Sequence, residues 1–155
     1  MNAAEPSLSF AVRYEWTETS IPAPYAYEWI IEIENLRGRI TFFHDYPHHN
    51  GSGWVRSFPI STGQINKLSE VCHTGRVFRT HWQMPAESSV SGPNESLTIW
   101  LDGQRYSVPS IRTAGANRAL QPVWLAIRAC VPQPVWDQLF ALRDGVIRKY
   151  LSTST

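Results

Sequence analysis

An alternating stretch between Tyr25 and Tyr46 constrains the fold of this chain more than any other feature. In its first half, YAYEWIIEIE, the odd positions are aromatic or aliphatic and most of the even positions are acidic. Successive side chains of a strand point to opposite faces of a sheet, so this pattern predicts a half-buried antiparallel strand. Asn35 to Gly38 then predict a tight reversal, because Asn and Gly tolerate positive φ. The returning strand places Ile40, Phe42 and His44 on one face.

The rest of the chain shows similar signals for strands and helices. Alternation predicts further strands over residues 7–18, 54–60, 76–83 and 97–101, the last followed by a hairpin turn at Asp102-Gly103. Ser61 with Gln64 fits a capping box, which starts a short helix that Gly75 ends. Two C-terminal helices follow. The first is expected near Gln121, with Pro122 at its first position, and the second at residue 134.

These elements together predict one α+β domain over residues 1–155, with residues 1–6 as a loose tail. Its expected architecture is a twisted antiparallel sheet of about six or seven strands, with one short inserted helix and two C-terminal helices packed on the sheet. The composition agrees, because 155 residues with 43% hydrophobic residues and a net charge of +1 are typical of a folded globular chain. The seven tryptophans lie mostly on the apolar positions of strands and helices, where we expect core packing.

The chain has the features of an intracellular protein. No apolar run approaches the ~20 residues that span a bilayer, and the first residues lack the pattern of a secretory signal. Cys72 and Cys130 are far apart and fall on the apolar sides of expected helices, so we expect buried, reduced thiols. These observations favour a cytoplasmic location and no association with a membrane.

Two features suggest a surface that binds another protein. Glu28, Glu32 and Glu34 alternate with apolar residues, so they form an acidic stripe if their face of the sheet is exposed. Such a stripe suits a basic protein partner and opposes nucleic acid, although an ordinary solvated face would show the same pattern. Trp100 lies opposite Leu97 and Ile99 in its strand, which favours an exposed aromatic anchor.

The segment before the C-terminal helices is a candidate for contact with an acidic group. Residues 108–118 hold Arg112, Gly115 and Arg118 ahead of an expected helix start. Arginine and helix N-termini both favour negative charge. The segment carries no phosphate-binding glycine motif, so a nucleotide has no specific support.

The histidines suggest a different kind of site. All five fall between His44 and His81, and His44, Asp45, His48 and His49 lie together where a strand enters a polar loop. Imidazole and carboxylate are ligands that zinc prefers, so these four residues form a candidate metal site. Their spacing matches no metal motif of known mechanism, and loop histidines without a ligand are the alternative interpretation.

Three functions therefore remain open. The first is a protein-binding module that acts by occluding a partner, such as a cytoplasmic inhibitor or immunity protein, with Glu28, Glu32, Glu34, Trp100, Arg112 and Arg118 as its partner-binding residues. The second is a small zinc enzyme or metal-binding protein that uses the His44 to His81 histidines. The third is a structural or accessory subunit without a ligand, for which a homodimer is possible. The first is favoured, because the chain shows no recognisable catalytic motif and carries the acidic stripe and the off-register Trp100, although the third is compatible with every feature of the sequence.

Overall fold

The computed structural model describes residues 9–18, 21–22, 24–44, 53–79, 81–82, 93–110 and 114–154. These residues form one six-stranded antiparallel sheet and three helices, which confirms the predicted α+β fold. The strand order is β4-β3-β2-β1-β5-β6. In chain order the elements are β1 (Phe10–Thr17), β2 (Glu28–Glu34), β3 (Arg37–Phe43), β4 (Trp54–Pro59), α2 (Thr62–Thr74), β5 (Asn94–Leu101), β6 (Gln104–Val108), α3 (Ala114–Cys130) and α4 (Gln133–Thr153).

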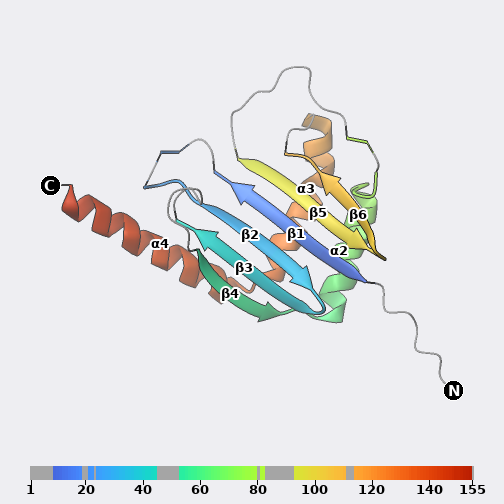
Figure 1. The fold of residues 1–155 in the computed structure, drawn as a ribbon, viewed down its shortest axis with the longest axis horizontal. Helices are drawn as coiled ribbons and strands as arrows, with labels where there is room; N and C mark the ends of the chain where they lie inside the picture. Colours follow the sequence, from blue (N-terminus) through green and yellow to red (C-terminus); the bar gives the residue numbers. More distant parts are fainter. Residues whose placement is uncertain are drawn as a thin grey trace.

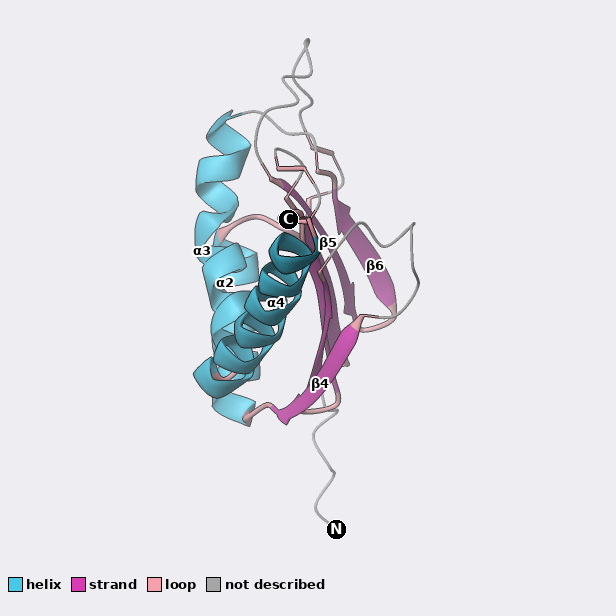
Figure 2. Cartoon of the chain, turned by 90° about the vertical axis from the view of Figure 1, so that its left-hand side faces the viewer, coloured by secondary structure: helices cyan, strands magenta, loops and turns pink. Residues whose placement is uncertain are grey.

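The helices and the sheet form two layers. Figures 1 and 2 show that α2, α3 and α4 all lie on one face of the sheet, while the opposite face carries none of the described helices. Alternating burial along β1 and β2 follows this arrangement, because only one of the two faces of each strand meets the helices. The sequence pattern of β2 therefore assigns its faces correctly.

Aromatic side chains fill much of the space between the layers. Trp16 and Trp29 are direct cross-strand partners, and their rings stack with centroids 4.0 Å apart. Trp136 of α4 meets Trp29 edge to face at 5.0 Å, so the same cluster holds α4 against the sheet. Trp124 of α3 stacks on the fully buried Tyr14. The predicted core role of these four tryptophans is confirmed.

Two predicted elements are wrong. The alternation over residues 76–83 does not form a strand in the part of this segment that the structure describes. α2 ends at Thr74 with Gly75 as its C-cap, and a turn follows in which Arg76 takes a φ of 56°. Val77 is buried in the core there, so packing accounts for its apolar character. α3 begins at Ala114 rather than near Gln121, and Pro122 lies inside it. The apolar face continues on both sides of that proline, through Leu120, Val123, Trp124 and Ile127, and its burial offsets the missing hydrogen bond.

Gly38 has a different role from the one that the sequence suggested. Asn35 and Leu36 take the two positive φ angles of the β2–β3 turn, and the strand resumes at Arg37. Gly38 lies inside β3, opposite Phe58 of β4. A Cβ atom at this position would lie 2.0 Å from Cε2 of Phe58. Close packing of an aromatic ring on the backbone therefore requires glycine here.

The two cysteines are free and buried, as predicted. Burial raises the pKa of the Cys72 thiol to about 12, and it also raises the pKa of the Cys130 thiol. Among the described residues, no helix is both long enough and apolar enough to cross a membrane.

The pKa of Cys72 predicts that the fold loses stability at alkaline pH. An unfolded thiol ionises near pH 8.5, whereas the buried thiol stays protonated up to about pH 12, so unfolding releases a proton between these values. The stability that the buried, protonated Cys72 thiol gives the fold is fully present below about pH 8.5 and decreases as the pH rises above that value. Urea unfolding at a series of pH values from neutral to alkaline should therefore show a flatter pH dependence for Cys72→Ala than for the wild type. Equal slopes would contradict this account.

Candidate protein interface

The candidate site is the open face of the sheet, defined as the face opposite the three described helices. Strand register places its side chains in rows that run across the strands, because directly paired residues point to the same side. The described side chains of the open face come from alternate residues of all six strands: Ala11, Arg13, Glu15, Thr17, Glu28, Ile30, Glu32, Glu34, Arg37, Arg39, Thr41, Phe43, Val55, Ser57, Pro59, Asn94, Ser96, Thr98, Trp100, Arg105 and Ser107.

A chain of ion pairs crosses the middle of the open face. Arg39 of β3 donates to Oε2 of Glu32, and Arg13 of β1 donates to Oε1 of the same carboxylate at 2.8 Å. Arg13 also donates through Nε to Glu15 at 2.6 Å. Each of the four side chains is at least partly exposed to solvent, so these ion pairs contribute modestly to the stability of the fold. Their main effect is to fix the orientations of the four side chains, which we call the ion ladder.

The open face is balanced in charge rather than acidic. Glu28, Glu32 and Glu34 share this face, as the alternation of β2 predicted. Neighbouring strands add arginines beside them, so the described charges are Arg13, Arg37, Arg39 and Arg105 against Glu15, Glu28, Glu32 and Glu34. The surface therefore has little net field to attract a uniformly basic partner.

The most exposed row of the open face lies beside the β2–β3 turn. It crosses the whole sheet and consists of Pro59, Arg37, Glu34, Ala11, Trp100 and Arg105, which we call the outer row. Trp100 is 36% exposed although it lies within a strand. Ala11, which has a short side chain, lies between Trp100 and Glu34 in this row. The Cα atoms of Glu34 and Trp100 lie roughly 10 Å apart, since two strand spacings separate them.

Three charged side chains of the outer row have no ion-pair or hydrogen-bond partner in the described part of the chain. They are Glu34, Arg37 and Arg105, and all three are exposed. This contrasts with the ion ladder one row away, in which every charge is paired. The outer row therefore combines one exposed aromatic ring with charges of both signs that remain available.

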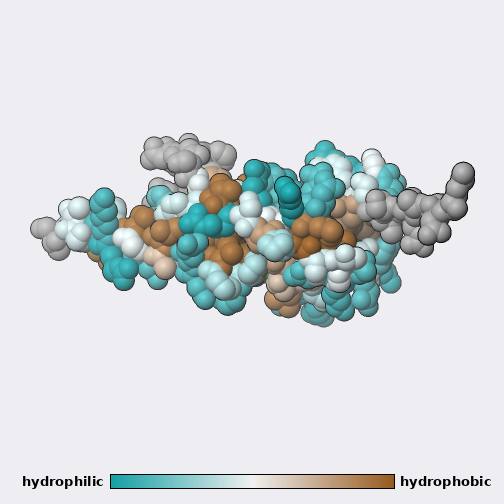
Figure 3. Space-filling view, turned by 90° about the horizontal axis from the view of Figure 1, so that it is seen from below, coloured by the Kyte–Doolittle hydropathy of each residue, from teal (hydrophilic) through white to brown (hydrophobic). Residues whose placement is uncertain are grey.

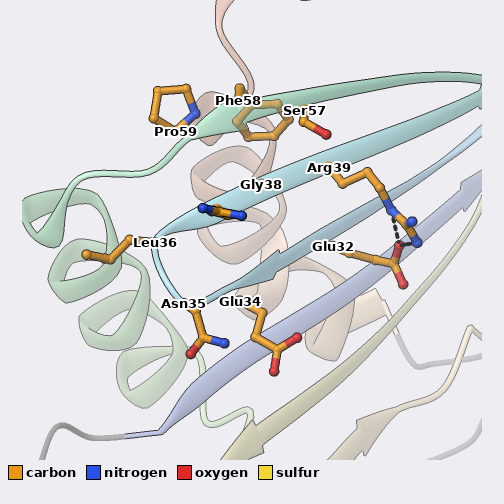
Figure 4. Close-up of a pocket in the computed structure, with 10 residues that line it drawn as sticks. Glu32, Glu34, Asn35, Leu36, Gly38, Arg39, Ser57, Phe58 and Pro59 are labelled. Carbon is orange, nitrogen blue, oxygen red and sulfur yellow. Dashed lines mark hydrogen bonds and ion pairs between the residues drawn. The ribbon is translucent and has the colours of Figure 1, made fainter.

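An open depression adjoins the outer row at the β2–β3 turn. Figure 4 shows it between the turn and β4, with Glu34, Asn35, Leu36 and Pro59 around it. Leu36 is 48% exposed and takes a φ of 59°, so the turn presents an apolar side chain to solvent at the edge of the charged surface. The depression thus extends the outer row around the end of the sheet.

The structure brings together only some of the residues that the sequence suggested for partner binding. Glu34 and Trp100 share the outer row, and Glu32 belongs to the ion ladder. Glu28 lies at the far end of β2 and accepts a hydrogen bond from Thr17. Arg118 is an exposed residue of α3, in the helical layer, rather than part of a loop, and Arg112 lies outside the described residues.

Arg37 and Arg105 were missed by the sequence reasoning. A signal for Arg105 is present, because it alternates with the apolar Tyr106 and Val108 and so must point outward from its strand. Arg37 was assigned to the turn, which hid its place in β3.

The candidate zinc ligands are only partly described. The ring of His44 lies 5.1 Å from that of Trp54, whereas Asp45, His48 and His49 lie outside the described residues. Within the described ranges, no group of three His, Cys, Asp or Glu residues is placed to hold a metal ion. The zinc hypothesis therefore stays a prediction from the sequence.

No known protein family matches this chain, and no curated protein matches its sequence.

Proposed function

We propose that the protein is a protein-binding module that acts by occluding a partner, in the manner of a cytoplasmic inhibitor or immunity protein, and that it binds through the open face. The observation that carries the proposal is Trp100, which is held out on a strand beside unpaired charges of both signs. Exposed tryptophan is enriched among residues that dominate binding energy. A cytoplasmic location is part of the proposal, since the free thiols of Cys72 and Cys130 suit a reducing compartment.

The outer row offers a rigid surface for such a contact. Its side chains stand on six paired strands, so little backbone entropy is lost when a partner docks. Trp100 would enter an apolar pocket of the partner, while Glu34 and Arg37 meet groups of opposite charge. Because the open face is balanced, the fitting partner surface carries both acidic and basic groups rather than an excess of basic ones. Nucleic acid remains disfavoured as a ligand, because a surface without net positive charge gains little from phosphate contacts.

Trp100→Ala should abolish most of the partner binding while leaving the fold intact. Tagged wild type and variant would capture proteins from an extract of the source cells, with mass spectrometry identifying what each retains. We expect one protein to be retained near stoichiometry by the wild type and reduced about tenfold or more by the variant, since loss of an anchor commonly costs more than 1.4 kcal/mol. Charge reversal by Glu34→Lys should weaken the same capture.

The matched control is Leu125→Ala, which shortens an exposed apolar residue of α3 in the helical layer. This variant should retain the partner at the wild-type level. Equal capture by Trp100→Ala and wild type would overturn the proposed face, and loss of capture with Leu125→Ala would move the interface to the helical layer.

A further inference from the structure

The β2–β3 turn holds a leucine where the backbone favours glycine. Its two residues, Asn35 and Leu36, take φ angles of 50° and 59°, as in a type I′ turn, which favours Asn followed by Gly. The β5–β6 turn of the same sheet follows this rule, since Asp102 and Gly103 take φ angles of 51° and 80°. A Cβ atom in this conformation lies close to a backbone carbonyl oxygen, so residues other than Gly, Asn and Asp rarely adopt it. Leu36 therefore makes the turn less stable than glycine would.

The fold makes little use of the Leu36 side chain. It is 48% exposed, and it is not among the described side chains that form the core or pack against it. The backbone of this residue does hold the turn in place, because the Leu36 carbonyl accepts a hydrogen bond from the Ile60 N–H at 2.9 Å. Any residue at position 36 could accept that bond. An exposed leucine in a conformation that leucine disfavours thus indicates a role outside folding.

Leu36 lies beside two charged side chains at the open depression. Figure 4 shows it at the turn, with Glu34 and Pro59 around the same depression. Glu34 and Arg37 flank the turn as a cross-strand pair, and neither side chain has a hydrogen-bond or ion-pair partner in the residues that the structure describes. An exposed apolar side chain next to available charges is the same combination that Trp100 shows in the outer row.

We propose that Leu36 is a second anchor for the partner that Trp100 binds, so this inference rests on the proposed function. Two strand spacings and two chain residues separate the two positions, so their Cα atoms lie within roughly 18 Å of each other. A standard interface buries about 800 Å² on each partner, so one partner can cover both side chains. Figure 3 looks onto the β4 edge of the sheet and shows hydrophobic surface in separate patches bordered by hydrophilic surface, which suits separate anchors.

The partner surface that fits this arrangement has two apolar pockets rather than one. The second pocket receives Leu36, and an acidic group beside it pairs with Arg37, the next residue in the chain. A basic group between the two pockets pairs with Glu34, which lies between the two anchors. This order of pocket, basic group, pocket and acidic group distinguishes the partner from proteins that match Trp100 alone.

Urea unfolding tests whether the fold needs this leucine. Leu36→Ala removes the side-chain contacts and keeps the disfavoured conformation, whereas Leu36→Gly relieves the conformation as well. We expect Leu36→Gly to unfold at the urea concentration of the wild type or a higher one, and Leu36→Ala at a lower one. Gly103→Ala is the matched control, because it adds a Cβ atom at the same position of the β5–β6 turn, with no atom within 4 Å. It should lower the midpoint about as much as Leu36→Ala falls below Leu36→Gly. A Leu36→Gly variant clearly less stable than the wild type would overturn the proposal.

Capture from an extract of the source cells tests the anchor itself. The protein that the wild type retains and Trp100→Ala loses should also be reduced about tenfold by Leu36→Gly, although the fold of this variant is intact. Arg37→Glu should reduce it too, whereas Leu125→Ala, at a leucine that is 57% exposed in the helical layer, should not. Loss with Trp100→Ala but not with Leu36→Gly would overturn this inference and leave the proposed function standing. Unchanged capture by both variants would overturn both.

Discussion

Gly38→Ala is expected to lower the free energy of unfolding by about 3 kcal/mol, at the upper end of the usual cost of overpacking a core. The added methyl group would lie 2.0 Å from Cε2 and 2.4 Å from Cζ of Phe58, well inside van der Waals contact. Phe58 cannot easily move away, because it is buried in the core between β4 and the helices. Either β4 shifts away from β3 or the phenyl ring leaves its preferred rotamer. Both responses weaken the packing of the core.

Urea unfolding of three variants would check this expectation. Gly145→Ala is the matched control, because its Cβ meets no atom within 4 Å and the substitution inside α4 should raise stability by about 1 kcal/mol. Phe58→Leu in the Gly38→Ala background should recover part of the loss, since the smaller side chain makes room for the methyl group. A Gly38→Ala variant as stable as the wild type would show that the ring moves without cost.

Glu95→Ala is the second substitution with a large expected effect, also about 3 kcal/mol. Glu95 points to the helical side of β5, where it accepts hydrogen bonds from the Tyr14 hydroxyl and from Arg128 of α3, both at 2.7 Å. Arg128 donates to the Tyr14 hydroxyl as well. Removing the carboxylate leaves a guanidinium and a buried hydroxyl with fewer partners, and an unmatched group of this kind usually costs several kcal/mol.

The substitution should be compared with Glu95→Gln by urea unfolding. Glutamine retains an acceptor oxygen of similar reach, so it should lose clearly less stability than alanine does. Tyr14→Phe and the Tyr14→Phe/Glu95→Ala double variant complete a cycle that isolates the coupling between these two residues. Burial, the negative charge of Glu95 and the hydrogen bond to it raise the pKa of the Tyr14 hydroxyl, so Tyr14 stays protonated and donates to Glu95. Equal losses for alanine and glutamine would contradict this expectation, because they would show that the negative charge of Glu95, rather than its acceptor oxygen, carries the whole effect.

The fold was predictable from the sequence where local signals and burial agree. The Asp102-Gly103 turn takes positive φ at both residues, and the Ser61–Gln64 capping box is present with both of its hydrogen bonds. The predictions failed where tertiary packing overrides a local pattern. Pro122 resembles a helix start, but the burial of residues on both sides of it keeps one helix continuous. The alternation after Gly75 resembles a strand, but Val77 is buried without strand pairing.

The candidate site was less predictable, because it depends on pairing between distant strands. The outward position of Trp100 follows from its own strand alone. Its place beside Ala11 and Glu34 depends on the β1–β5 and β1–β2 registers, which no local pattern specifies. The β1–β2 and β2–β3 registers place Arg13 and Arg39 against Glu32, so an apparently acidic strand becomes part of a neutral surface.

The position of β1 in the middle of the sheet has a consequence for how the chain folds. Its partner on one side, β2, follows directly in the sequence, whereas β5 is reached only after two further strands and a helix. Strands β1 to β4 can therefore assemble from neighbouring segments, but closing the loop to β5 is entropically costly and slows folding. Until β5 has been synthesised and docked, β1 is an unpaired edge that other chains can join. A newly made chain is thus most exposed to aggregation before its residues 94–101 reach the sheet.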